Sequence, residues 1–135
     1  MYSVSVRGSF SSAHNLRAYK GKCEELHGHN WKVEVTVSCP QLDKTGMVID
    51  FKILRTKLEK VLETLDHKYL NNIIYFRKVN PTSENIAKYI YNRLRSEFKG
   101  LQKVTVWESE DSCATYEPRP SFWVRNRDKG RPDEE

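Results

Sequence analysis

Two long stretches of the chain alternate between apolar and polar side chains. In residues 2–14 the even-numbered positions are mostly apolar and end with His14. In residues 29–39 the odd-numbered positions begin with His29 and continue through Trp31 and three valines. Successive side chains of a strand point to opposite faces of its sheet, so this alternation predicts two half-buried strands of an antiparallel sheet.

Two helices are predicted after these strands. Asp50 is a suitable N-cap for an apolar series that starts at Phe51 and recurs at helical spacing as far as Leu65. Thr82 or the serine after it can begin a second amphipathic helix, which we expect to end just before Gly100.

Residues 104–108 and 113–117 have the composition of two further short strands. The order strand, strand, helix, helix, strand, strand predicts an α+β fold, with two helices on one face of a four-stranded antiparallel sheet. We expect residues 1–118 to form a single domain and residues 119–135 to be a charged, partly disordered extension.

Three of the four histidines lie where the two long strands would meet, at positions 14, 27 and 29. If neither strand has a bulge, His14, His27 and His29 share the apolar face, and neutral imidazoles are common zinc ligands. This predicts a Zn²⁺ site with three nitrogen donors and an open fourth position, as in catalytic zinc sites. Copper or nickel would accept the same ligands, and a strand-entry turn that merely contains histidines is the alternative.

Cys23 lies four positions before His27, and its function is left open by that spacing. As a fourth metal ligand it would close the site and make the metal structural. As a free thiol near the metal it could act as a base. A buried, inert cysteine fits this polar segment poorly.

Carboxylates supply the remaining candidates for the site. Asp66 and His67 can form an acid–base pair, although a histidine at a helix end is also favoured electrostatically. Glu108 ends an apolar strand and could accept two hydrogen bonds from a guanidine-like edge such as that of a pterin, or simply be the solvent end of the strand. Glu84 is more ambiguous, because carboxylates are favoured in a first helical turn by the dipole alone.

Composition narrows the class of protein. The net charge of +5 suits an anionic small molecule, with nucleic acid as the competing partner. Three scattered cysteines argue against a disulfide framework. No apolar stretch approaches the ~20 residues of a membrane span and no signal-peptide segment is apparent, so we expect a cytoplasmic protein.

Six motifs in this order resemble the 6-pyruvoyl-tetrahydropterin synthase / 6-carboxy-tetrahydropterin synthase family. They cover about residues 2–118: Ser11-Ser12-Ala13-His14, Cys23-Glu24-Glu25-Leu26-His27-Gly28-His29-Asn30, Gly46-Met47-Val48-Ile49-Asp50-Phe51, Leu65-Asp66-His67-Lys68-Tyr69-Leu70-Asn71, Asn80-Pro81-Thr82-Ser83-Glu84-Asn85 and Trp107-Glu108. The resemblance implies the tunnelling fold, trimers that stack into a hexamer, and active sites between subunits.

The resemblance also implies roles for individual residues. Zinc would be held by the three histidines, Cys23 would be the base, and Asp66 with His67 would form its partner relay. Glu108 would anchor the pterin, and the substrate-binding set would be completed by Thr82 and Glu84.

The three residues between the cysteine and His-Gly-His resemble the carboxy-forming branch of the family, which belongs to queuosine biosynthesis. This implies a lyase that converts 7,8-dihydroneopterin triphosphate to 6-carboxy-5,6,7,8-tetrahydropterin, acetaldehyde and triphosphate, with no nucleic-acid or membrane partner. The pyruvoyl-forming synthase is the first alternative. A zinc-stabilised RNA-binding module is a distant one.

Overall fold

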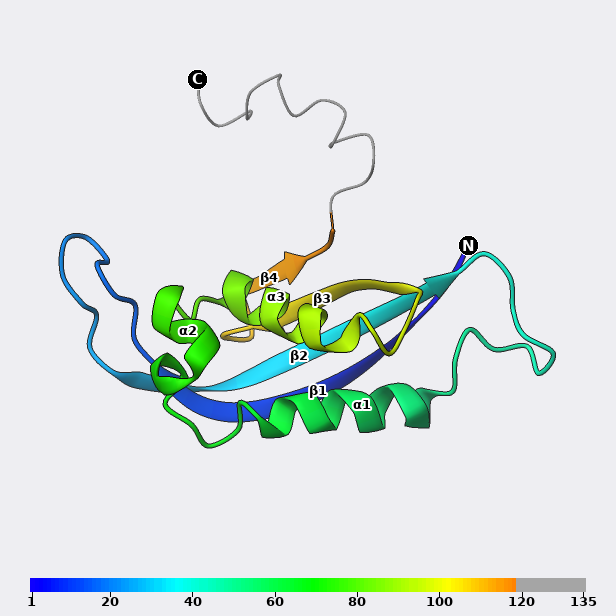
Figure 1. The fold of residues 1–135 in the computed structure, drawn as a ribbon, viewed down its shortest axis with the longest axis horizontal. Coiled ribbons are helices and arrows are strands. Elements are labelled where there is room, and N and C mark those ends of the chain that lie inside the picture. Colours follow the sequence, from blue (N-terminus) through cyan, green and yellow to red (C-terminus); the bar gives the residue numbers. More distant parts are fainter. Residues whose placement is uncertain (119–135) are drawn as a thin grey trace, which may run out of the picture.

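The computed structural model describes residues 1–118, which contain one antiparallel sheet of four strands in the order β1-β2-β3-β4 (Figure 1). The strands are β1 (Tyr2–His14), β2 (His27–Cys39), β3 (Leu101–Trp107) and β4 (Cys113–Tyr116). The predicted α+β class and four-stranded antiparallel sheet are therefore confirmed. The extension predicted for residues 119–135 lies outside the described residues.

β1 and β2 pair along their whole length in a constant register, from Tyr2 opposite Cys39 to His14 opposite His27. β1 consequently has no bulge, and its side chains alternate between the two faces of the sheet without interruption. Val6 and Phe10 of β1 are buried, Val4 is half-buried and Tyr2 at the strand start is exposed, whereas the odd-numbered positions are exposed or half-buried. Because the alternation is uninterrupted, His14 at the end of β1 points to the same face of the sheet as the core residues Val6 and Phe10.

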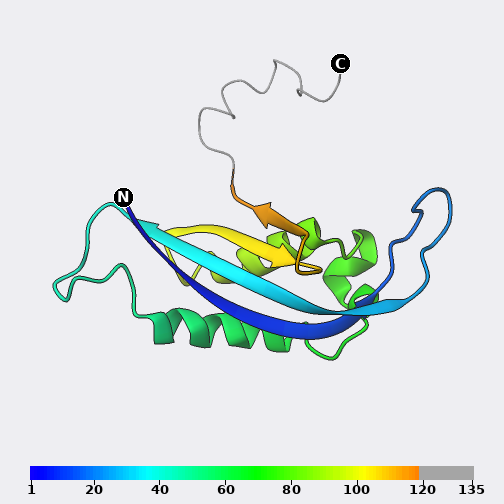
Figure 2. The ribbon, with the colours of Figure 1, turned by 180° about the vertical axis from the view of Figure 1, so that it is seen from behind.

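Two helices, α1 (Phe51–Glu63) and α3 (Ser83–Leu94), cover one face of the sheet. α3 lies in front of the strands in Figure 1 and behind them in Figure 2, and α1 runs along β1 below it in both views. Asp50 caps α1 by accepting a hydrogen bond from the N–H of Lys52, as its position in the sequence predicted. Thr82 is the N-cap of α3. Between helices and sheet lies one core of buried apolar side chains, including Trp31, Leu54, Leu58, Leu65, Ile86, Ile90, Val104 and Val106.

The end of α3 differs from the prediction. The helix stops at Leu94 rather than near Gly100, and the chain continues through turns in which Leu94 and Phe98 accept backbone hydrogen bonds from Glu97 and Leu101. Phe98 is nevertheless buried, because it reaches the core from the turn. Its helical spacing therefore extended the predicted helix too far, and β3 begins earlier than expected.

A short helix that the sequence did not predict lies between α1 and α3. It is α2 (Ile74–Lys78), and it follows a single 3₁₀ turn, η1 (Leu70–Asn72). Segments of five and three residues are too short to show a helical period in the sequence. None of the helices in residues 1–118 is long and apolar enough to cross a bilayer.

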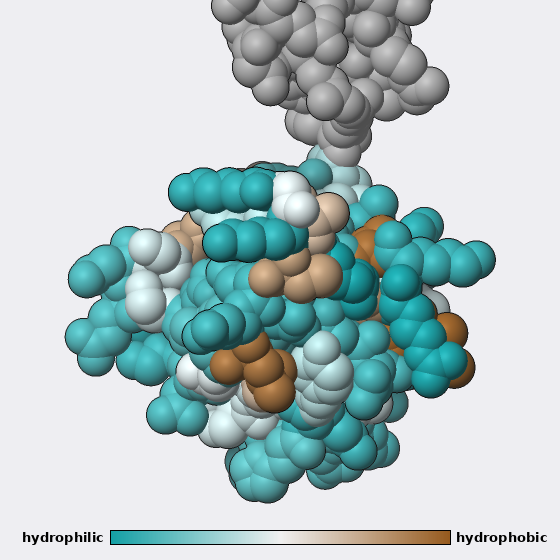
Figure 3. All heavy atoms as spheres, turned by 90° about the vertical axis from the view of Figure 1, so that its left-hand side faces the viewer, coloured by the Kyte–Doolittle hydropathy of each residue, from teal (hydrophilic) through white to brown (hydrophobic). Residues whose placement is uncertain are grey.

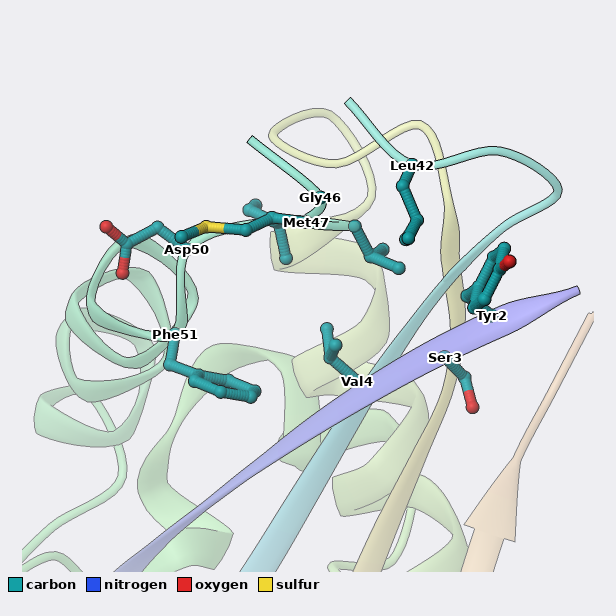
Figure 4. A pocket seen from close by; sticks show the side chains of 10 residues that line it. Tyr2, Ser3, Val4, Leu42, Gly46, Met47, Asp50 and Phe51 are labelled. Atoms are coloured by element: carbon teal, nitrogen blue, oxygen red, sulfur yellow. The ribbon is translucent and has the colours of Figure 1, made fainter. Parts of the chain in front are cut away.

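An apolar pocket of about 320 Å³ lies where β1 begins. Figure 4 shows Tyr2 and Val4 of β1 on one side and Leu42 and Met47 of the β2–α1 loop on the other. Phe51 also lines the pocket and is 56% exposed. Its predicted place in the buried stripe of α1 is therefore wrong, because the first turn of the helix extends past the core.

Candidate metal centre and active site

Three histidines meet where β1 ends and β2 begins. His14 is the last residue of β1 and lies directly opposite His27, the first residue of β2. His29 follows two positions later and, like Trp31, is on the same face of β2 as His27. His14 Nε2 lies 3.1 Å from His27 Nε2, and the ring centroids of His14 and His29 are 5.1 Å apart. The structure thus brings the three predicted metal ligands together.

The carboxylate of Glu108 lies beside the three imidazole rings. Glu108 comes directly after β3, and its Oε1 lies 2.9 Å from His29 Nε2 and 3.3 Å from His14 Nε2. One donor atom from each of His14, His27, His29 and Glu108 lies within 4.8 Å of the others. The sequence predicted Glu108 as a pterin-binding residue. Its place beside the histidines depends on the pairing of β2 with β3.

Backbone carbonyls fix the orientation of two of these rings. His14 Nδ1 lies 2.7 Å from the carbonyl oxygen of Pro81, and His27 Nδ1 lies 2.9 Å from that of Glu25. A carbonyl can only accept, so each Nδ1 must carry the hydrogen and each Nε2 then presents a lone pair to the other. Two lone pairs 3.1 Å apart repel each other unless a proton or a metal ion lies between them. Ring nitrogens held in this way are typical of metal ligands.

His29 gives an independent test of whether a metal ion fits. Its Nε2 is buried and has no hydrogen-bond partner among residues 1–118, although Glu108 Oε1 is only 2.9 Å away. Burial is the main reason that the pKa of His29 is lowered, and the charge of Glu108 opposes this effect. A neutral imidazole and a carboxylate both have lone pairs at this point. A divalent cation would satisfy both, so the residues fit a metal ion.

Cys23 is exposed and lies outside this group of donors. The next residue, Glu24, holds its loop to the end of β1. Its N–H donates to the carbonyl of Leu16, and its Oε1 accepts from the N–H of Leu16. Glu24 Oε1 also lies 3.7 Å from His27 Nδ1. The structure therefore places a carboxylate, not the thiol, next to the outer nitrogen of this histidine.

Asp66 and His67 lie on the outer edge of β1 and not in the group of metal donors. His67 Nδ1 is 3.0 Å from Asp66 Oδ1, and Asp66 Oδ1 accepts a hydrogen bond from the N–H of Ser11 at 2.9 Å. This backbone N–H is the main reason that the pKa of Asp66 is lowered, and the charge of His67 adds to it. The His67 side chain is 81% exposed, and its backbone φ is 54°, which non-glycine residues rarely adopt. The pair is thus preformed and faces outward.

The start of α3 approaches the metal centre through its backbone. The carbonyl of Pro81 accepts from His14, and the hydroxyl of Thr82 accepts from the N–H of Asn85. Thr82 therefore lies beside the centre as a helix cap, whereas Glu84 is exposed in the first turn.

Two contributors were missed in the sequence. Pro81 acts through its carbonyl, which no residue type reveals. Trp31 is fully buried, with its ring centroid 4.8 Å from that of His14 and 5.1 Å from that of His29. Its Nε1–H donates to the carbonyl of Ser12. The sequence already placed Trp31 on the same strand face as His29. We interpreted it only as a core residue, because the alternation of apolar and polar residues does not distinguish a core side chain from one that contacts a site.

The fold and the site together define an α+β domain with a group of three histidines and one carboxylate, able to hold a metal ion, at one end of its antiparallel sheet. A family model described as 6-pyruvoyl tetrahydropterin synthase matches residues 3–119. The chain belongs to the 6-pyruvoyl tetrahydropterin synthase family.

Relatives with different names resemble the chain to a similar degree. It is 38% identical to the 6-carboxy-5,6,7,8-tetrahydropterin synthase of Synechocystis sp., over 86% of this chain and 93% of the relative. It is also 38% identical to the dihydroneopterin monophosphate aldolase of Pyrococcus furiosus, over 80% of this chain and 90% of the relative. The solved 6-pyruvoyl tetrahydropterin synthase of Caenorhabditis elegans superposes with a TM-score of 0.77 at 30% identity, covering 87% of this chain and 96% of that one. These names support an enzyme of pterin synthesis, and the choice of reaction depends on the site.

Proposed function

We propose that the chain is a zinc-dependent carbon–carbon lyase of queuosine biosynthesis. It would convert 7,8-dihydroneopterin triphosphate and water to 6-carboxy-5,6,7,8-tetrahydropterin, acetaldehyde and triphosphate. The observation that carries the proposal is the convergence of three ring nitrogens beside a carboxylate. A cysteine at the spacing of the carboxy-forming branch supports this product over the others.

His14, His27 and His29 would hold the zinc ion. Bound there, zinc supplies Lewis acidity that acidifies the side-chain hydroxyls of the substrate and polarises the developing carbonyl. The carbonyls of Pro81 and Glu25 keep two of the rings in the tautomer that a metal requires.

The remaining residues would move protons and hold the substrate. Cys23 is proposed to shuttle a proton between the side chain and the pterin ring, and Asp66 with His67 to exchange one with a side-chain hydroxyl. Glu108 would accept hydrogen bonds from the N–H groups of the pterin edge. We retain Thr82 and Glu84 as candidates for substrate contact, on the basis that Thr82 lies next to the carbonyl that orients His14.

The resemblance to the pterin synthase family implies active sites between subunits, and the position of one catalytic candidate pair is consistent with this. Asp66 and His67 lie outside the donor group, and the His67 side chain is 81% exposed, so it is available to a neighbouring subunit. We therefore propose a homohexamer, a dimer of trimers, in the cytoplasm, with each active site shared between neighbouring subunits.

Product analysis is the first test. The zinc-loaded protein is incubated with 7,8-dihydroneopterin triphosphate, and the products are identified by mass spectrometry. We expect 6-carboxy-5,6,7,8-tetrahydropterin with acetaldehyde. A pyruvoyl product would assign the reaction named for the Caenorhabditis elegans protein. No turnover of the triphosphate, with aldol cleavage in a parallel incubation with 7,8-dihydroneopterin monophosphate, would assign that of the Pyrococcus furiosus enzyme.

Substitution of Cys23 separates its two possible functions. Cys23→Ala should abolish turnover while the protein keeps one zinc per chain, because Glu108 and not this thiol lies among the donors. Loss of zinc together with activity would indicate ligation by sulfur. That result would favour the RNA-binding alternative, which depends on a closed site of one cysteine and three histidines.

Mixing two inactive variants tests the shared site. Cys23→Ala and His67→Ala homo-oligomers, dissociated and reassembled together, should regain part of the wild-type activity if one subunit supplies the thiol and another the histidine. Reassembly of either variant with itself is the control. Activity that stays absent in a mixed oligomer of normal size would contradict the shared site.

A further inference from the structure

Glu108 is the least constrained member of the metal centre. His14 and His27 are each hydrogen-bonded to a backbone carbonyl, whereas the polar contacts of the Glu108 carboxylate within residues 1–118 are with imidazoles alone. The side chain is 38% exposed. The residue begins the turn between β3 and β4, where its backbone N–H donates to the carbonyl of Ser112. The carboxylate can therefore rotate away without breaking a hydrogen bond.

In its present position the carboxylate completes a set of four donors. Glu108 Oε1 is 2.9 Å from the unpartnered Nε2 of His29, so the two atoms can share one cation but cannot share a proton in good hydrogen-bond geometry. Four protein donors saturate a zinc ion and are typical of closed sites. With Glu108 in this position, protein donors would fill all four places of a tetrahedral zinc ion.

The proposed reaction places two requirements on the metal site and its carboxylate. One coordination position must be free for the substrate side chain, and the same carboxylate must accept hydrogen bonds from the pterin edge. A single carboxylate cannot remain on the metal and lie along that edge.

We propose that Glu108 is an exchangeable metal ligand that the pterin edge removes. In the substrate-free enzyme its carboxylate occupies the fourth position of the metal. When the amino-pyrimidinone edge of a pterin binds, Glu108 turns to accept its N–H groups, and the fourth position is freed. This inference rests on the proposed function, and it makes recognition of the ring a condition for access to the metal.

The exchange gives the centre a basis for selectivity. Small alcohols and diols can bind a metal with an open position but offer no N–H edge that would attract the carboxylate. Such compounds must then compete with an anionic ligand held at high local concentration. A pterin removes that ligand through its own hydrogen bonds, which are charge-assisted and strong.

Metal affinity tests the first half of the inference. Glu108→Gln in the full-length protein should raise the Kd for Zn²⁺ by about 10–100-fold, measured by competition with a chromophoric chelator. Glu110→Gln is the matched control, because Glu110 lies in the same turn, is exposed and is outside the donor group. Equal Kd values for Glu108→Gln, Glu110→Gln and the wild type would overturn the inference and leave the proposed function standing.

The visible spectrum of the Co²⁺-substituted protein tests the second half, since it reports the ligands of the ion without turnover. Unsubstituted pterin, which has the edge but no side-chain hydroxyls, should shift the wild-type spectrum toward that of Glu108→Gln. Glycerol at high concentration should not. Pterin that quenches protein fluorescence on binding yet leaves the Co²⁺ spectrum unchanged contradicts the exchange alone. Absence of any pterin binding contradicts the proposed function as well.

Discussion

The two ends of the β1–β2 pair are built by the same alternation but differ in chemistry. At one end the inward-facing positions are His14, His27 and His29, and the surface around this end is mainly hydrophilic (Figure 3). At the other end the inward-facing Tyr2 and Val4 line an apolar pocket. Alternation decides which face a side chain takes, and the residues beyond the strand ends decide what surrounds it.

The surroundings differ in what the neighbouring segments supply. The site end receives polar groups from outside the two strands, namely the carbonyl of Pro81, the carbonyl of Glu25 and the carboxylate of Glu108. The far end receives apolar side chains such as Leu42 and Met47 from one loop. Function is therefore concentrated where segments distant in the chain contribute polar atoms, and the far end is suited to packing.

The largest expected effect separates the buried His14 of the site end from the exposed His67. His14→Ala should weaken Zn²⁺ binding by more than about 100-fold, beyond the 10–100-fold typical of an outer-shell partner, because it removes a ligand that is 2% exposed. His67→Ala is the control and should leave the Kd for Zn²⁺ unchanged, since its side chain is 81% exposed and outside the donor group. Isothermal titration of both proteins measures this. Equal losses would mean that the metal binds elsewhere.

A smaller effect is expected at the far end, on stability rather than on metal binding. A Cβ added at Gly100 would lie 2.3 Å from the carbonyl oxygen of Ser38, so Gly100→Ala must displace backbone and should cost about 1–3 kcal/mol. Gly28→Ala at the site end meets nothing closer than 3.9 Å and should cost less than about 0.5 kcal/mol. Urea unfolding of the metal-free proteins checks both values. A larger loss for Gly28→Ala would reverse the contrast between the two ends.

The smallest effect concerns the pH dependence of Asp66. The N–H of Ser11 lowers the pKa of this carboxyl below its ordinary value of 3.8, so the folded state binds its proton less readily than the unfolded state. The resulting stabilisation is present above pH 3.8, the ordinary pKa of the carboxyl, and is lost as the pH falls through the lowered pKa. The Tm difference between wild type and Asp66→Asn should accordingly be constant near neutral pH and shrink below 3.8. A difference that grows on acidification would show that the pKa is raised instead.

Parts of the site could be predicted because they depend on local pattern. His14 and His29 were assigned to one face from alternation alone, and the constant register of β1 with β2 then places His14 opposite His27. Asp50 and Thr82 were recognisable as caps from their position before apolar helical series. Local pattern also caused an error. Phe98 continues the helical spacing of the apolar residues, so the helix was predicted to extend past it, but its buried side chain belongs to a turn.

The sequence by itself determined the order of the four strands and two long helices, the faces of the two long strands and the three histidines at one of their ends, because side-chain periodicity is a property of a single segment. Only the tertiary structure decided that Glu108 would join those histidines and that Asp66 and His67 would lie outside that group. Those positions depend on the pairing of β2 with β3 and on hydrogen bonds to the edge of β1. Contacts between distant segments are set by packing and register, which no local pattern specifies.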